Sequence, residues 1–287
     1  MIERGHEACG MRHQAKIGLC WAVGCLMALL WAGAATAEGR PRTDEPAVEY
    51  TVELREPQTQ YVEMSMRLRD VKSPMVEVRL PVWRPGRYLV LDPATTVSGV
   101  RARSGTGRSL ACGKVGKSTW LVQADPAKDE GVGEYRVYCN ALADRTRHVD
   151  DTHAFLSPST VFMYSPDWRD RALRVKVVAP AGWKTATGME ADPAVPGAFV
   201  AADYDVLVDS PLEIGQHETI TFDVEGVPHE IVVWRGGSSP PGPLYGRMAD
   251  DFAKIVRTER EVFGELPYKK YVFLLHVYPG GGGGTEH

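Results

Sequence analysis

The sequence lacks several motifs that identify common classes of enzyme. It contains no G-x-S-x-G, which is typical of serine hydrolases, no P-loop, and no G-x-G-x-x-G between a strand and a helix. It also lacks an excess of basic residues, since 33 Lys and Arg stand against 37 Asp and Glu and the formal net charge is −4. This balance gives no electrostatic reason to bind nucleic acid, so we expect no nucleic-acid partner.

Cysteine is scarce. Of the five cysteines, Cys9, Cys20 and Cys25 lie near the amino terminus, so the rest of the chain carries Cys112 and Cys139. In an oxidising compartment two cysteines can form one disulfide. The alternative is two buried free thiols.

The first 37 residues have the order of a secretory signal peptide. Arg12 and Lys16 precede an apolar stretch from Ile17 to Gly33, and Ala-Thr-Ala at 35–37 fits the small-x-small pattern before a cleavage site. We therefore predict cleavage after Ala37 and a periplasmic or secreted protein with no stable membrane span after signal removal. The alternative is a retained membrane anchor, since about 17 apolar residues approach the lower limit for a span.

Short strands account for most of the remaining chain. Hydrophobic residues alternate with polar ones from Val48, and further strand-like runs follow between Pro and Gly residues without intervening helices. This pattern predicts a mainly β protein with an antiparallel β-sandwich at 48–235. The predicted strands are 48–54, 61–68, 75–80, 120–122, 134–139, 173–178, 219–224 and 230–234.

The composition changes at 236–243, where Gly, Ser and Pro predict a linker. After it, hydrophobic residues recur every three or four positions from Leu244 to Phe263, which predicts an amphipathic helix that Gly264 ends. An apolar run at 271–277 predicts a buried strand. A helix followed by a strand is typical of the start of an α/β domain, which we place at 244–287.

Three separated matches, in the right order along the chain, resemble a known family. The stretch 263–276, followed by Gly-Gly-Thr-Glu-His at 283–287, resembles the glycyl aminopeptidase family of zinc metallopeptidases, metallopeptidase family sixty-one, whose members carry G-G-x-E-H before their zinc helix. Residues 80–88 resemble that family's L-P-x-W-x-P-G-x-Y segment, and 204–215 resemble its Y-D-x-L-x-D-S-P-x-E-x-G segment. The resemblance covers residues 48–287, and it implies a β domain followed by the first elements of a thermolysin-like catalytic domain.

The resemblance implies a substrate-binding role for residues 280–287, which we call the glycine-rich loop. Glu286 would pair with the free α-ammonium of a peptide substrate, and Gly283 and Gly284 would present backbone groups to it. A charge-assisted hydrogen bond of this kind contributes ~1.5–3 kcal/mol. No role is implied for His287, and Thr285 departs from the family's usual apolar residue.

The zinc helix of such an enzyme needs H-E-x-x-H. The His-Glu pairs begin at His6, His217 and His229, and none has a second His four positions after the first. We therefore expect zinc in the full-length family enzyme but none bound by this chain, which we interpret as truncated before the zinc helix and inactive alone. No catalytic residue is assigned.

Other candidate sites favour structural interpretations. The cluster His148-x-Asp150-Asp151-x-His153 has metal-ligand residue types, but it lies in a polar stretch where such groups are usually solvated, so we predict no metal site there. Trp83 in the Trp-Arg-Pro-Gly segment 83–86 is expected to pack in the sandwich. Asp-Ser-Pro at 209–211 is typical of a turn, and neither Asp205 nor Asp209 is expected to be catalytic.

Two functions are compatible with these observations. The first is the amino-terminal fragment of an exported zinc aminopeptidase, whose full-length form would hydrolyse peptides from the free amino end. The second is a non-catalytic periplasmic β-sandwich that binds peptide or protein partners.

Overall fold

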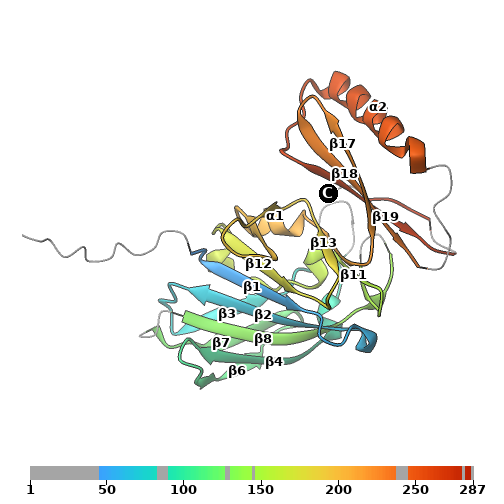
Figure 1. Ribbon diagram of the computed structural model, residues 1–287. Coiled ribbons are helices and arrows are strands. Elements are labelled where there is room, and N and C mark those ends of the chain that lie inside the picture. Colours follow the sequence, from blue (N-terminus) through green and yellow to red (C-terminus); the bar gives the residue numbers. More distant parts are fainter. Residues whose placement is uncertain are drawn as a thin grey trace, which may run out of the picture. The chain divides into compact units, whose positions relative to one another are not determined.

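Figure 1 shows the computed structural model of the chain, which describes residues 45–82, 90–126, 130–143, 146–236, 245–279 and 282–285. Residues Asp44–His287 form one compact unit. The predicted signal peptide at 1–37 and the segment 83–86 lie outside the described residues.

The largest sheet has eight strands in the order β14-β15-β12-β1-β2-β8-β4-β5. Its neighbouring strands are antiparallel except β1 and β12, which run parallel. The strands are β1 (Val48–Glu53), β2 (Tyr61–Arg69), β4 (Val97–Ser104), β5 (Ser109–Leu110), β8 (Glu130–Tyr138), β12 (Leu173–Val178), β14 (Glu190–Ala191) and β15 (Ala198–Ala201).

A three-stranded sheet shares a hydrophobic core with the large sheet. Its order is β3-β7-β6, and its strands are β3 (Met75–Arg79), β6 (Cys112–Lys114) and β7 (Thr119–Gln123). Alternate residues of β1 are buried, as the period-two pattern predicts, and Tyr50 and Val52 enter the same core as Val78 and Trp120 of the smaller sheet. The two sheets therefore form a sandwich.

Five further strands form a sheet in the order β13-β16-β11-β10-β9. The strands are β9 (Asn140–Ala141), β10 (Arg147–Val149), β11 (His153–Leu156), β13 (Lys184–Ala186) and β16 (Leu212–Gly215). Every residue of β11 and β16 is buried. Gly215 lies opposite His153, and a Cβ at Gly215 would stand 2.6 Å from the carbonyl oxygen of Thr152 and 2.7 Å from Cα of His153. Glycine is therefore required for the two strands to approach this closely.

The last sheet contains β17 (Glu218–Val224), β18 (Val227–Arg235) and β19 (Tyr271–Val277) in that order. β17 and β18 are antiparallel, whereas β18 and β19 run parallel. The helix α2 (Tyr245–Phe263) packs on β17 through Val224, Ala253 and Val256. Gly264 ends the helix with a φ of 89°, and its N–H donates to the carbonyl of Arg260 at 2.8 Å.

The fold is mainly β with several antiparallel sheets, as the sequence predicts. The structure has a strand at each of the eight runs predicted within 48–235, and it has the helix and the strand predicted after 244. One arrangement differs from the prediction: β17 and β18, which we placed in the sandwich, pair with β19 beyond the predicted linker. The small sheet therefore joins strands from both sides of 236–243, a segment in which the structure describes Gly236 alone.

A short helix, α1 (Tyr204–Val208), directly precedes the segment 209–211, for which the sequence predicts a turn. Asp203 caps it, since its side chain accepts a hydrogen bond from the backbone N–H of Val206 at 2.8 Å. Asp205 forms an exposed ion pair with Arg169 at 2.9 Å. One turn of helix is too short to produce a recognisable period, so the pattern could not reveal it.

Four 3-10 helices connect strands of the described chain, and each begins with proline, whose fixed φ suits the first helical position. They are Pro57–Thr59, Pro93–Thr96, Pro158–Thr160 and Pro166–Trp168.

Cys112 and Cys139 are both free. They lie on different sheets, since Cys112 begins β6 and Cys139 follows β8 of the large sheet. The thiol of Cys139 is buried and donates to the carbonyl of Val137 at 3.4 Å, and burial raises the pKa of that thiol to about 12. The structure thus has two free thiols rather than the predicted disulfide candidate.

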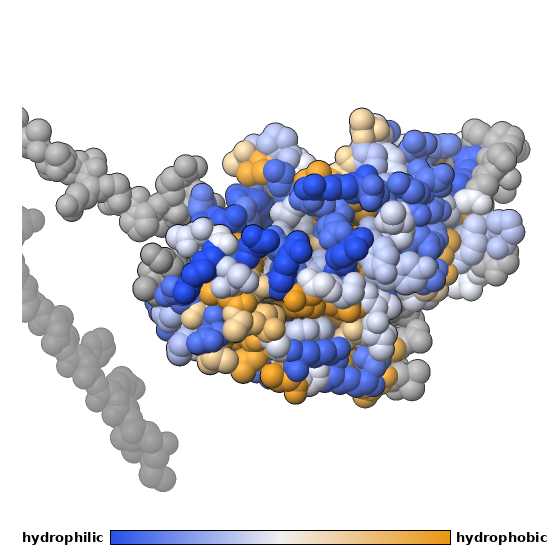
Figure 2. Space-filling view, turned by 90° about the horizontal axis from the view of Figure 1, so that it is seen from below, coloured by the Kyte–Doolittle hydropathy of each residue, from blue (hydrophilic) through white to orange (hydrophobic). Residues whose placement is uncertain are grey.

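On the face shown in Figure 2, a band of hydrophilic residues lies beside hydrophobic ones. Ion pairs cross the large sheet, for example Arg67 to Glu130 and Arg136 to Glu63, both at 2.6 Å. Such partly exposed pairs contribute ~0–1 kcal/mol each. Within the described segments, no helix has both the length and the hydrophobicity needed to cross a bilayer.

Candidate functional site

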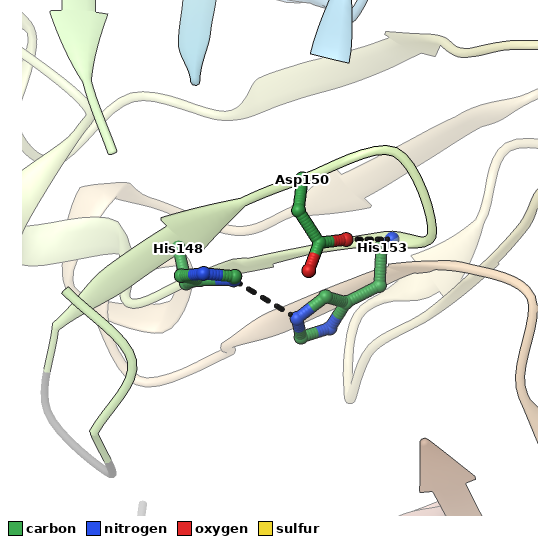
Figure 3. A group of neighbouring side chains, drawn as sticks. All are labelled: His148, Asp150 and His153. Carbon is green, nitrogen blue, oxygen red and sulfur yellow. Dashed lines mark hydrogen bonds between the residues drawn. The ribbon is translucent and has the colours of Figure 1, made fainter. Parts of the chain in front are cut away.

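The β10–β11 hairpin brings three ligand-type side chains to one face. His148 lies opposite Phe155 in the register. Because alternate residues of a strand share a face, His153 and Asp150 lie on the same face as His148. Figure 3 shows the three side chains together, with Nδ1 of His148 and Nε2 of His153 3.1 Å apart.

Asp150 shapes the turn between the two strands. Its Oδ1 accepts hydrogen bonds from the backbone N–H of Thr152 at 2.8 Å, the hydroxyl of Thr152 at 2.7 Å and the backbone N–H of His153 at 3.0 Å. Burial would raise the pKa of Asp150, but these hydrogen bonds outweigh it and lower the pKa below its ordinary value. The carboxylate is therefore ionised at neutral pH, and its second oxygen points toward the two imidazoles (Figure 3).

Glu213 of β16 lies at the centre of the buried network. It is opposite Phe155 and is 1% exposed. Its Oε1 is 2.8 Å from Nδ1 of His153, and its Oε2 is 2.9 Å from Nε2 of His276 on β19. Burial would raise the pKa of Glu213, but the hydrogen bonds from the two histidines lower it below the ordinary value. An ionised carboxylate can only accept, so both histidine nitrogens donate.

Trp234 of β18 covers the imidazole of His153. The two rings stack with centroids 3.5 Å apart and an interplanar angle of 8°. The indole N–H donates to the hydroxyl of Thr152 at 3.1 Å. Since Trp234 lies opposite His276 in the register, the small sheet presents both side chains to the hairpin.

His148 is half-buried, as are Asp150 and His276. Burial and the neighbouring His153 lower its pKa below the ordinary value. Its imidazole is therefore mostly neutral at pH 7, the form that can ligate a metal. We use the name histidine–glutamate cluster for His148, Asp150, His153, Glu213, Trp234 and His276.

The arrangement offers two kinds of chemistry. A continuous hydrogen-bonded chain runs from His148 through His153 and Glu213 to His276. It joins the hairpin to β19, the strand before the glycine-rich loop. The same residues contain two sets of metal-ligand atoms that lie within 4.8 Å of one another, His148–Asp150–His153 and His153–Glu213–His276.

The structure brings some of the candidate site residues together and leaves others apart. His148, Asp150 and His153 come together, whereas Asp151 is exposed and belongs to neither set. Gly283 and Gly284 are exposed, and a Cβ at Gly284 would meet no atom within 4 Å. Glu286 and His287 lie outside the described residues.

The sequence reasoning missed Glu213, His276 and Trp234. Glu213 and His276 are 63 positions apart, so no local pattern could pair them. A signal was nonetheless present, because Glu213 lies in the segment 204–215 and His276 ends the segment 263–276, both of which resemble the same family.

Residues 49–216 match the family model described as the peptidase M61 N-terminal domain. No curated protein matches the chain. A solved structure of an aminopeptidase N family protein from Idiomarina loihiensis is similar, with a TM-score of 0.75 and 28% identity. The match covers 82% of this chain and 40% of that chain, so this chain spans less than half of that protein.

Weaker similarities extend to other peptidase structures. A mutant M1 zinc metallopeptidase from Deinococcus radiodurans has a TM-score of 0.44 and 12% identity over 79% of this chain and 55% of that one. Leukotriene A4 hydrolase from Saccharomyces cerevisiae has a TM-score of 0.47 and 11% identity over 80% and 37%. These scores are too low to support an inference.

Proposed function

The chain belongs to the peptidase M61 family, and we propose from this membership that it is the amino-terminal part of an exported zinc aminopeptidase. The observation that carries the proposal is the match of residues 49–216 to the family's N-terminal domain, together with a structural similarity that extends over 82% of the chain. Because the chain covers 40% of the similar solved protein, peptide hydrolysis is proposed for the whole protein and not for these 287 residues.

The catalytic zinc of the proposed enzyme needs a ligand set that these 287 residues do not contain. Its ligands in such an enzyme come from H-E-x-x-H, a motif absent from the 287 residues. The chain therefore does not supply that ligand set. The role that we propose for the chain is to bind and orient the substrate.

β19 is the element that we propose to present the substrate loop. It lies at one edge of the small sheet, and an edge strand has free backbone groups that can pair with an extended peptide. The loop after it contains the exposed Gly283 and Gly284. Glu286 would hold the free amino group of the peptide, which selects substrates by their amino terminus.

The proposal predicts a metal-dependent aminopeptidase activity. The whole protein should be expressed and assayed with zinc and amino-acyl p-nitroanilides. We expect hydrolysis of substrates with a free amino group and little hydrolysis of acetylated ones. In Glu286→Gln, kcat/KM should fall by ~10- to 100-fold, since one charge-assisted hydrogen bond is lost.

The matched control is Glu265→Gln, which removes a carboxylate from an exposed residue between α2 and β19. This variant should keep the wild-type kcat/KM. An inactive zinc-loaded protein, or equal activity of the Glu286→Gln variant and the wild type, would contradict the proposal.

Export is a separate part of the proposal. Its support is the order of basic, apolar and small residues in 1–37. Amino-terminal sequencing of the exported protein should begin at Glu38. Recovery of the intact segment in a membrane fraction would instead favour the retained anchor.

The binding-module alternative makes a different prediction. A non-catalytic β-sandwich would bind peptides without releasing product, whether or not zinc is added. Equilibrium binding of a peptide by the whole protein, with no turnover, would therefore favour this alternative.

A further inference from the structure

We propose that the β10–β11 hairpin holds a divalent transition-metal ion, with zinc as the expected occupant, through Nδ1 of His148, Nε2 of His153 and Oδ2 of Asp150. The three residues lie within positions 148–153, inside the region that matches the amino-terminal domain. The site is therefore separate from the catalytic zinc site expected in H-E-x-x-H, and it does not depend on the peptidase proposal.

The spacing of the two imidazoles suits a shared ion. Zinc binds histidine nitrogen at ~2.0–2.1 Å. For two nitrogens 3.1 Å apart, an ion at that distance from each would have an N–Zn–N angle of about 100°. This angle is near the tetrahedral value. The ligand atoms of the three residues lie within 4.8 Å of one another. Small side-chain movements would complete the site.

The buried network fixes the tautomer that metal binding needs. Glu213 accepts a hydrogen bond from Nδ1 of His153, so the lone pair of the neutral ring is on Nε2, which faces His148. A ligating histidine usually donates its other ring N–H to a carboxylate, as His153 does here. His276 holds the second oxygen of Glu213, and Trp234 stacks on the ring of His153.

Asp150 is positioned to be the third ligand of the ion. Its Oδ1 is occupied by three hydrogen bonds from Thr152 and His153, which fix the carboxylate. Its Oδ2 accepts no hydrogen bond from the residues that the structure describes and points toward the two imidazoles (Figure 3). The carboxylate can therefore ligate through Oδ2 without losing the turn.

The donor set indicates the class of ion. Two imidazole nitrogens and one carboxylate oxygen suit zinc, cobalt, nickel and copper, whereas calcium and magnesium prefer oxygen ligands. Three protein ligands leave a position for water or another small ligand. The ion would join β10 to β11 and stiffen the hairpin that carries His153, whose Nδ1 donates to Glu213 of β16.

The test uses the 287-residue chain produced without a histidine tag and stripped with a chelator. Zinc is titrated by calorimetry, and bound metal is counted after dialysis. We expect one zinc per wild-type chain and a higher melting temperature with zinc. His148→Gln and Asp150→Asn should each weaken binding by at least ~10-fold. Cobalt should give the visible absorption of a four-coordinate site in the wild type and lose it in both variants.

Asp151→Asn is the matched control, because it changes an exposed carboxylate of the same turn. It should bind zinc as the wild type does. Asp150→Asn keeps an oxygen that can accept the turn's hydrogen bonds, and circular dichroism checks that each variant is folded. The alternative is that Nδ1 of His148 simply donates a hydrogen bond to His153. A wild-type chain that binds no stoichiometric zinc would establish this alternative and overturn the proposal, as would wild-type affinity in His148→Gln and Asp150→Asn.

Discussion

The region from Val48 to Gly215 and the helix-backed sheet from Glu218 to Val277 bury their hydrophobic residues in different ways. In the first region, strands from several sheets supply one core with fully buried side chains such as Val52, Val137 and Leu156. In the second, the cluster under α2 has three buried residues, and no residue of β19 is fully buried. The central strand β18 is the well-buried part of the small sheet.

The contacts that join the two regions include several directional polar ones. Glu213 accepts from His276, and Trp234 stacks on His153 and donates to Thr152. Hydrogen bonds and ring stacking fix an orientation more sharply than a hydrophobic contact does. We infer that the first region is stable through its own core, whereas the placement of β19 against that region depends on the histidine–glutamate cluster, in addition to the pairing of β19 with β18.

The largest expected effect is a cavity in the main core. Leu156→Ala should lower the free energy of unfolding by ~2–5 kcal/mol, because Leu156 is fully buried and its side chain would leave a cavity. Urea denaturation measures the change. Ile255→Ala on the exposed side of α2 is the control and should change stability by less than ~0.5 kcal/mol. A loss for Leu156→Ala no larger than that of the control would contradict a single shared core.

Gly215→Ala tests the close approach of β11 and β16. The new methyl group would meet the carbonyl of Thr152 at 2.6 Å, so one strand would have to shift, at a cost of ~1–3 kcal/mol. Gly226→Ala replaces another glycine that has open space around it. Because the φ of Gly226 is 85°, alanine there would strain the backbone, but its methyl group would not contact His153. The NMR signals of His153 should therefore move in Gly215→Ala and stay in place in Gly226→Ala.

Val256→Ala tests the thinner core under α2. The change removes buried methyl groups, and the higher helix propensity of Ala offsets part of the loss, so we expect a destabilisation of ~1 kcal/mol. Hydrogen exchange should speed up in α2 and β17 and stay constant in β1 and β2. Uniform acceleration in all strands would show that the two regions unfold as one unit.

The smallest expected effect is a pH dependence in the small sheet. Burial lowers the pKa of His229 below its ordinary value of 6.5, despite the opposing effects of the Val227 carbonyl and Asp223. Below pH 6.5 the unfolded chain therefore binds this proton more tightly than the folded chain, and stability decreases as the pH falls. His229→Gln should show a shallower loss of stability between pH 7 and pH 5 than the wild type, in urea titrations at each pH. Parallel curves would exclude His229 as a source of the dependence.

Much of the fold could be predicted because its signals are local. The alternation in 48–54 and 61–68 marks one buried face of each strand, and Gly264 marks the end of a helix whose period is visible from Leu244 to Phe263. Sheet membership is not local, since it depends on which distant strands pair. For that reason β17 and β18 were assigned to the sandwich, although they pair with β19.

Part of the candidate site could be predicted, because three of its residues form a local pattern in the sequence. His148, Asp150 and His153 are close in the sequence and are metal-ligand residue types, but the polar stretch around them predicts solvated side chains. Glu213 makes the environment of His153 buried and charged instead of solvated, and its hydrogen bond to His153 fixes the tautomer of the imidazole. That contact spans 60 positions and becomes visible once β11 and β16 are paired.

The most direct test of the account is the hydrogen exchange of β19 in variants of His276, followed by mass spectrometry. His276→Leu removes the donor to Glu213, whereas His276→Gln keeps an amide N–H near the same position. We predict faster exchange of residues 271–277 in the Leu variant, an intermediate rate in the Gln variant, and unchanged exchange in β1 and β2. Wild-type exchange of 271–277 in the Leu variant would contradict the claim that the histidine–glutamate cluster holds β19 in place.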